Sequence, residues 1–185
     1  VVRSGLLGRL QNQLEAAGMP YDSMGGVQPN PLMSKAREGI QQALDFKADF
    51  ILGVGGGSVL DTAKAIAHGI ATPDVDIWEY WSGRQPITKT TPMGAVLTIS
   101  AAGSETSNSA VLTNDEIGKK CGTNTDLNRP KFAIMNPELT YTLPPYQIAC
   151  GTADIIMHTL ERYMTHTEGN NFTDRVAEEL IKNVM

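Results

Sequence analysis

Apolar residues recur every three or four positions along several stretches of the chain, which is the spacing of one face of an α-helix. This pattern predicts a first helix over residues 3–17, and Gly18 followed by Pro20 is a typical stop signal. A second amphipathic helix follows a loop rich in glycine and proline. Its apolar face comprises Ala36, Ile40, Ala43 and Leu44.

Other apolar stretches predict strands. Residues 49–54 predict a strand whose residues after Asp49 are continuously apolar rather than alternating, as expected for a parallel strand that is buried on both faces. Residues 94–100 and 132–135 predict two further strands, and residues 110–113 and 119–121 predict a hairpin. The order of helix, strand, glycine turn and helix indicates an α/β sheet with crossover connections.

Residues 72–92 lack a regular pattern and predict a long loop. The loop contains an aromatic cluster at residues 77–81, for which packing is favoured over a place at the edge of a cofactor or substrate site. After Pro144 and Pro145 the pattern becomes helical through Met164, and again over about residues 172–184. The simplest division is an α/β part over residues 1–145 and the first helices of an all-helical part over residues 146–185.

Composition narrows the class of protein. The 185 residues are 41% hydrophobic and 19% charged, and they suffice for one domain or for one domain plus part of another. A net charge of −5 without a Lys/Arg cluster argues against binding to nucleic acid. The two cysteines share no motif spacing and predict reduced thiols. Because no apolar run approaches the roughly 20 residues that span a bilayer, and no signal peptide is recognisable, a cytoplasmic protein without a membrane partner is expected.

The ends of the chain carry their own expectation. The first residue is Val1 rather than Met, a helical pattern begins almost at once, and the last helical pattern reaches Met185 without a cap. We therefore expect that sequence has been removed upstream and that the helical part is truncated.

A glycine-rich bend at residues 55–58 joins the strand at residues 49–54 to a helix at residues 59–67. Consecutive glycines let backbone N–H groups approach phosphate oxygens, and the N-terminus of the helix adds its positive dipole end. Ser58 is expected to donate its hydroxyl and to cap the helix. The bend matches neither the dinucleotide fingerprint nor the nucleoside-triphosphate loop, so a purely structural turn remains an alternative.

Three polar residues lie near this bend. Asp61 and Lys64 occupy the first turns of the helix, where the simpler interpretation is a cap matched to the helix dipole and a solvated surface charge. Thr98 lies at the end of a buried strand, which is where α/β sheets place ligand contacts. For Thr98 the residues alone leave a ligand contact and a structural role equally open.

Asp154 and His158 stand four residues apart in a predicted helix. Such residues differ by about 40° around the helix axis and about 6 Å along it, so both could bind one divalent ion, and a carboxylate with an imidazole suits Fe(II) or Zn(II). A hydrogen-bonded surface pair is the alternative. Neither His68 nor His166 is a convincing third ligand, so the chain supplies two ligands where a catalytic site normally has three or more.

Four ordered motifs, at residues 55–64, 103–105, 142–144 and 151–163, resemble the iron-containing (group III) alcohol dehydrogenases, in particular the butanol dehydrogenase and broad-range aldehyde reductase branch. The resemblance covers essentially the whole chain. It implies a Rossmann-like, parallel-sheet nucleotide-binding domain followed by the start of an all-helical metal-binding domain. The active site would lie in the cleft between them.

The resemblance also implies roles for single residues. Asp154 and His158 match the first two of four metal ligands, an aspartate and three histidines, and they would be catalytic through that metal. Ala102 stands where many relatives carry a threonine that touches the cofactor. Family members are much longer and begin with a strand and a loop that selects between NAD and NADP. The implied cofactor-binding residues are Gly55, Gly56, Gly57, Ser58, Asp61, Thr98 and Lys120, the last of which would reach the nicotinamide-side ribose.

The activity implied by this resemblance is hydride transfer between NAD or NADP and a primary alcohol or aldehyde, such as butanol or butyraldehyde. A divalent metal, Fe²⁺ or Zn²⁺, would act on the substrate oxygen, and a homodimer is expected. One alternative is a dehydroquinate-synthase-like lyase, which also combines NAD with a divalent metal but needs basic residues for a phosphorylated sugar acid. The other is an inactive or self-associating fragment of the dehydrogenase, because missing strands would leave sheet edges open to another copy.

Overall fold

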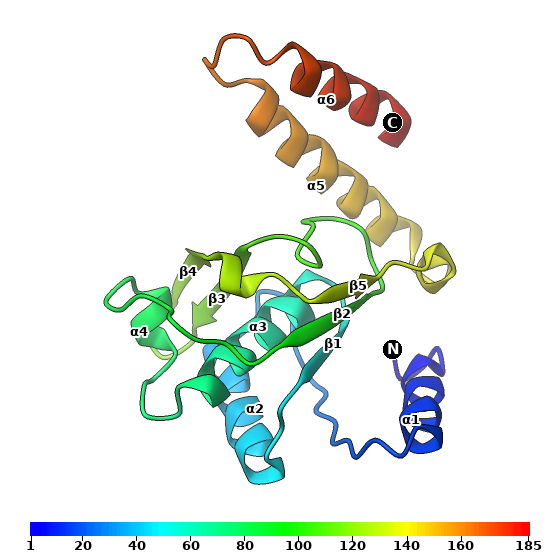
Figure 1. Ribbon diagram of the computed structural model, residues 1–185. Coiled ribbons are helices and arrows are strands. Elements are labelled where there is room, and N and C mark those ends of the chain that lie inside the picture. The colour runs from blue at the N-terminus through cyan, green and yellow to red at the C-terminus, as the bar shows by residue number, and fades with distance from the viewer.

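Three parallel strands form the central sheet in the computed structural model, which describes all 185 residues (Figure 1). Strand β1 (Ile51–Gly55) pairs with β2 (Met93–Leu97), and β2 pairs in turn with β5 (Phe132–Ile134). The register places Gly55 opposite Leu97, so β1 and β2 end together at the carboxyl edge of the sheet. The predicted α/β architecture with parallel strands is confirmed.

Helix α3 (Gly57–Ala71) covers one face of this sheet, and helix α2 (Met33–Phe46) packs against α3. The close approach of α3 depends on Gly53, because a Cβ atom at this position would lie 2.8 Å from the side chain of Leu60. Leu60 is itself fully buried beneath the helix. Gly53 therefore has a packing role within β1, separate from the glycines of the bend that follows the strand.

The opposite face of the sheet is only partly covered. Helix α1 (Leu6–Ala16) lies beside it, but Leu52 and Val54 are half-buried and Ile134 is exposed. The prediction that the strand at residues 49–54 is buried on both faces is therefore wrong. An apolar run shows that the residues are hydrophobic, but it does not show whether a second layer of structure covers that face of the sheet.

A second core lies under the hairpin of β3 (Ser109–Asn114) and β4 (Lys119–Asn124), which confirms the predicted hairpin. The short helix α4 (Trp78–Trp81) interrupts the segment predicted to be a loop. Its aromatic side chains are buried, and the Trp81 indole N–H donates to the Ala110 carbonyl oxygen over 3.2 Å. The packing interpretation of the aromatic cluster is thus confirmed.

Two long helices complete the chain, as the sequence predicts. Helix α5 (Pro145–Tyr163) begins after the 3₁₀ turns η1 (Asp126–Asn128) and η2 (Pro137–Thr140), and helix α6 (Asn171–Val184) packs back along it. Figure 1 shows this pair extending away from the sheet. The division into two domains at residue 145 coincides with the start of α5 and remains a prediction. None of the helices combines the length and the apolar character needed to cross a membrane.

The buried contact of β3 with the second core gives a stability prediction. Leu112 is fully buried among Met33, Ile77 and other members of that core. Leu112→Ala should lower the free energy of unfolding by about 3 kcal/mol, because it removes apolar contacts and leaves a cavity. Urea unfolding measures the change. Ile117→Ala, at an exposed position of the same hairpin, is the control and should stay within about 0.5 kcal/mol of the parent protein; equal losses for both variants would contradict this account of the core.

Candidate functional site

Three backbone N–H groups in the bend between β1 and α3 have no hydrogen-bond acceptor within the protein. Strand β1 ends at Gly55, Gly56 is the N-cap of α3, and Gly57 is its first residue. The N–H groups of Gly56, Gly57 and Ser58 make no hydrogen bond within the protein. Three free donors at the N-terminus of a fifteen-residue helix form an environment suited to an anion.

Ser58 does not have its predicted capping role. The N-cap residue of α3 is Gly56, and no side chain caps the helix. Ser58 is instead the second residue of the helix, past the position from which a hydroxyl can cap the first turn. The prediction of a serine cap is therefore wrong, and the helix end keeps its donors free.

The glycines of the bend differ in what surrounds them. A Cβ atom would lie 2.6 Å from the Val59 side chain at Gly55 and 2.5 Å from the Ile99 side chain at Gly56, so packing alone excludes larger residues there. At Gly57 no protein atom lies within 4 Å of the Cβ position. The structural-turn alternative thus explains two of the glycines. The open space at Gly57 is what a phosphate cradle requires.

Thr98 lies directly beside this bend. It follows the last residue of β2, is half-buried, and donates its backbone N–H to the Gly55 carbonyl oxygen over 3.1 Å. The next residue, Ile99, contacts Gly56 as described above. The segment after β2 therefore forms one wall of the bend, at the carboxyl edge of the sheet where α/β proteins bind ligands.

Lys64 is not a solvated surface charge, and Asp61 neither caps α3 nor lies in its first turn, so the simpler interpretation from the sequence is wrong for both. Lys64 is only 1% exposed, and Asp61 is half-buried. The Ser104 hydroxyl donates to Asp61 Oδ1 over 2.7 Å and accepts from Lys64 Nζ over 2.9 Å, while the Val111 N–H donates to Asp61 Oδ2 over 3.0 Å. Both carboxylate oxygens of Asp61 thus have protein donors.

Burial dominates the titration of this pair. It raises the pKa of Asp61 above its usual value, although the hydrogen bonds from Ser104 and Val111 act in the opposite direction. It lowers the pKa of Lys64 to about 8, against the attraction of Asp61. The role of Asp61 in cofactor binding remains a prediction, and the structure gives it a role in the protein's own hydrogen bonding.

Lys120 lies on the exposed strand β4, and its Nζ donates to Asn30 Oδ1 over 2.8 Å. Asn30 has a left-handed backbone with φ of 57°. This contact joins two segments ninety positions apart in the sequence. Asn30 was not among the predicted site residues; its place between two prolines marks a turn but does not reveal a long-range partner.

Asp154 and His158 lie on one face of α5, as their spacing predicts. His158 Nε2 is 3.7 Å from Asp154 Oδ1, and the side chains are 42% and 44% exposed respectively. Both therefore keep lone pairs accessible, and a carboxylate with an imidazole fits a divalent transition metal. No group of three or more Cys, His, Asp or Glu side chains in the structure could complete a metal site, so this pair supplies two donors only.

The glycine bend and the Asp154/His158 pair are linked through the segment after β2. A Cβ atom at Gly151 would lie 2.5 Å from the Ser100 carbonyl oxygen, so α5 rests directly on this segment. Positions 151, 154 and 158 follow the i, i+3, i+7 spacing of one helix face. The face that carries the pair is thus the face that meets the segment bordering the glycine bend.

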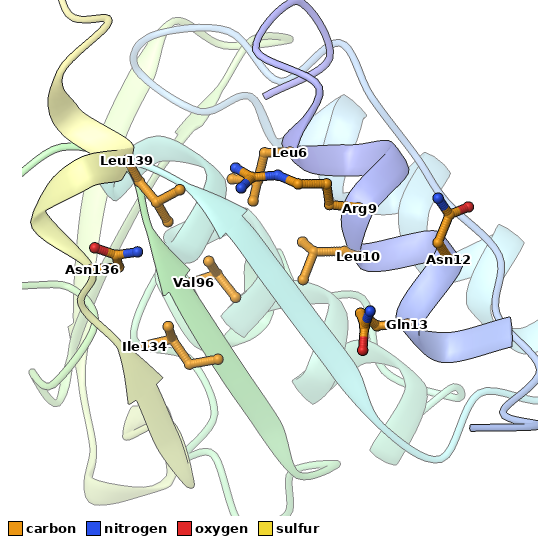
Figure 2. Close-up of a pocket in the computed structure, with 9 residues that line it drawn as sticks. All are labelled: Leu6, Arg9, Leu10, Asn12, Gln13, Val96, Ile134, Asn136 and Leu139. Carbon is orange, nitrogen blue, oxygen red and sulfur yellow. The ribbon is translucent and has the colours of Figure 1, made fainter. Parts of the chain in front are cut away.

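A groove of ≈ 390 Å³ lies elsewhere, between α1 and the partly covered face of the sheet (Figure 2). None of the site residues predicted from the sequence lines it. The lining residues are Leu6, Arg9, Leu10, Asn12, Gln13, Val96, Ile134, Asn136 and Leu139.

Comparison with known proteins identifies the family. Residues 1–137 match the profile of the family described as "Iron-containing alcohol dehydrogenase", and the chain belongs to this family. It is 37% identical over 182 residues to NADH-dependent butanol dehydrogenase A of Clostridium acetobutylicum, covering 98% of this chain and 46% of that protein. It is also 37% identical to the NADPH-dependent aldehyde reductase YqhD of Escherichia coli, covering 98% of this chain and 47% of the reductase.

The solved structures agree with the sequence comparison. The crystal structure of an NADH-dependent butanol dehydrogenase A from Thermotoga maritima superposes with a TM-score of 0.92 at 38% identity, over 98% of this chain and 45% of that one. The resemblance to this family and its Rossmann-like fold is confirmed. The chain spans about half the length of the curated relatives it matches.

The contact between Gly151 and Ser100 gives a testable prediction. Gly151→Ala should loosen α5 from the segment after β2, because the added methyl group would meet a backbone oxygen rather than a flexible side chain. Limited proteolysis followed by mass spectrometry should show faster cleavage within residues 145–185. Gly8→Ala in α1, where no atom lies within 4 Å, is the matched control and should leave the pattern unchanged. Identical cleavage of both variants would show that the contact does not hold α5.

Proposed function

We propose that this chain carries the dinucleotide-binding part and the first two metal ligands of an iron-containing-type alcohol dehydrogenase, which transfers a hydride between NAD or NADP and a primary alcohol or aldehyde. The supporting observation is the link described above. The bend with three free N–H donors borders the short segment after β2, and the helix that carries the carboxylate–imidazole pair meets the same segment at Gly151. We also propose that residues 1–145 and 146–185 belong to separate domains.

The pyrophosphate of the dinucleotide would bind at the glycine bend. The N–H groups of Gly56, Gly57 and Ser58 would donate to its oxygens, and Gly55 shapes the turn. Thr98 would contact the cofactor from the adjoining strand end, and Lys120 would reach the ribose next to the nicotinamide. The bound dinucleotide supplies the hydride donor or acceptor.

Asp154 and His158 would hold a divalent ion, Fe²⁺ or Zn²⁺, together with further ligands. When bound, such an ion supplies Lewis-acid polarisation of an alcohol or carbonyl oxygen. The chain's own residues would orient the two groups: α5 carries the pair and meets the segment after β2 at Gly151, and that segment borders the glycine bend. Holding two reacting groups in register is a large part of the catalysis of hydride transfer.

The substrate class rests on the relatives. Those named above are described as butanol dehydrogenases and an aldehyde reductase, so we propose a primary alcohol or aldehyde such as butanol or butyraldehyde. Both NADH and NADPH occur in their names, and the chain is assigned to neither. We further propose a cytoplasmic homodimer.

The two alternatives have less support. A dehydroquinate-synthase-like lyase would need basic side chains for a phosphorylated substrate, and the nearest one on α5, Arg162, donates instead to the His158 carbonyl oxygen. An inactive or self-associating fragment would show no turnover, which an activity assay can test. Oxidation of NADH or NADPH with butyraldehyde by the full-length protein that carries this chain would support the dehydrogenase over both alternatives.

A substitution at Gly57 distinguishes the two interpretations of the bend, a phosphate cradle and a purely structural turn. Gly57→Ala should weaken dinucleotide binding about tenfold, equivalent to about 1.4 kcal/mol, because the methyl group enters space that the pyrophosphate would occupy. Isothermal titration with NADH and NADPH measures the affinity. The melting temperature should not fall, since no protein atom lies within 4 Å. Unchanged affinity, or a loss of stability in its place, would favour the turn.

The metal assignment predicts a separate effect. His158→Ala should abolish binding of Fe²⁺ or Zn²⁺ and metal-dependent turnover of butyraldehyde, while the affinity for the dinucleotide stays at the parent value, because the glycine bend is untouched. Metal content by atomic emission and affinity by titration give the two readouts. His166→Ala, at an exposed position after α5, is the control and should change neither. Full turnover by His158→Ala in metal-free buffer would refute the assignment.

A further inference from the structure

Lys64 and His68 are both fully buried ionisable residues that the proposed mechanism does not use, and Lys64 is the one that contacts the segment after β2. It is among the largest fully buried side chains, and it lies on α3, the helix whose N-terminus forms the glycine bend. Its Nζ donates to the Ser104 hydroxyl over 2.9 Å, to the Ser107 carbonyl oxygen over 3.3 Å and to the Ser109 carbonyl oxygen over 2.8 Å. All three acceptors lie within six residues of one another.

These contacts make full use of an ammonium group. An ammonium has three N–H donors, and the structure provides one hydroxyl and two carbonyl oxygens to accept them. No carboxylate lies in direct contact; Asp61 is joined to Lys64 through the Ser104 hydroxyl, which accepts from the lysine and donates to the aspartate. Removing the ammonium would leave the Ser107 carbonyl oxygen without this donor, and would leave the Ser109 carbonyl oxygen with the longer bond from the Ser107 hydroxyl, at 3.4 Å.

The acceptors place Lys64 at one end of the β2–β3 loop, which we define as residues 98–108. The other end of this loop is held by the bond from the Thr98 N–H to the Gly55 carbonyl oxygen. Between these two ends, Ser100 and Ala101 contact Gly151 of α5. The β2–β3 loop is thus fixed to β1 at its start and to α3 at its end, and α5 meets it at Ser100 and Ala101, near its start.

We propose that Lys64 is a positioning residue for hydride transfer: by holding the β2–β3 loop on α3, it sets the spacing between the glycine bend and the Asp154/His158 pair. This inference rests on the proposed function. Lys64 touches neither cofactor nor substrate in this account and acts through the loop. Replacing Lys64 should therefore change the spacing between the glycine bend and the Asp154/His158 pair. It should not change the phosphate-binding N–H groups, which belong to α3 and to the bend.

The test compares Lys64→Met with Lys131→Met in the full-length protein that carries this chain. Lys131 is exposed and its side chain makes no hydrogen bond or ion pair, so its replacement controls for the loss of a positive charge. Three quantities are measured. Hydrogen–deuterium exchange is followed for each peptide, and the dissociation constant of the dinucleotide is obtained by titration. The kcat and KM are determined with butyraldehyde as the substrate.

The expected result for Lys64→Met has three parts. Exchange should become about tenfold faster in residues 98–108 and in the first half of α5, but not in α3. The dissociation constant of the dinucleotide should change little. The kcat should fall about 100-fold, as expected when reacting groups are displaced by about 1 Å. Lys131→Met should match the parent protein in all three measurements.

Ser104→Ala keeps the test valid if Lys64→Met does not fold. It removes the hydroxyl bridge but leaves the two carbonyl contacts of Lys64 and the Val111 contact of Asp61, so it should give the same pattern with smaller amplitude. A lower melting temperature with parental kcat and parental exchange in residues 98–108 would overturn the proposal, because that is the result of a structural role alone. If the parent protein neither binds a dinucleotide nor reduces butyraldehyde, the proposed function fails, and the exchange pattern still decides whether Lys64 positions the loop and α5.

Discussion

The carbonyl group of Ser100 lies against the backbone of Gly151, and this close approach is the constraint on which the proposed site depends. Two residues earlier in the same loop, Thr98 is hydrogen-bonded to the end of β1, where the glycine bend begins. Within a few residues, the loop therefore contacts both the glycine bend and the helix that carries Asp154 and His158. A side chain larger than hydrogen at position 151 would push α5, with Asp154 and His158, away from the bend.

The two halves of the site are held in different ways. The glycine bend is backbone, and its three free N–H groups are fixed by the strand that ends and the helix that begins there. The Asp154/His158 pair consists of exposed side chains on a helix whose main attachment to the sheet is the loop after β2. The buried Lys64 and the half-buried Asp61 hold that loop through their hydrogen bonds to Ser104. Burying two charges is costly unless every donor and acceptor has a partner, and the partners here all lie on the loop and on β3.

Periodicity was enough to predict the elements whose signals are local. The long helices and the placement of Asp154 beside His158 follow from spacings of three and four residues, and the strands follow from short apolar runs. The errors concern long-range contacts. Lys64 was taken for a solvated charge because its acceptors lie 40 to 45 positions away, and the contact of Lys120 with Asn30 spans 90. Likewise, Leu52 and Val54 are apolar whether or not a second layer covers them, so their half-exposed face could not be read from composition. Ser58 does not cap the helix because α3 begins at Gly57, two residues earlier than a cap at Ser58 requires.

A crystal structure of the full-length protein with NADH or NADPH and Zn²⁺ tests the central claim most directly. The pyrophosphate oxygens should accept hydrogen bonds from the N–H groups of Gly57 and Ser58, and the nicotinamide ring should lie on the side of the β2–β3 loop that meets α5. The zinc ion should be bound by Asp154 and His158. A dinucleotide in the groove between α1 and the sheet, or a metal bound away from this pair, would contradict the account.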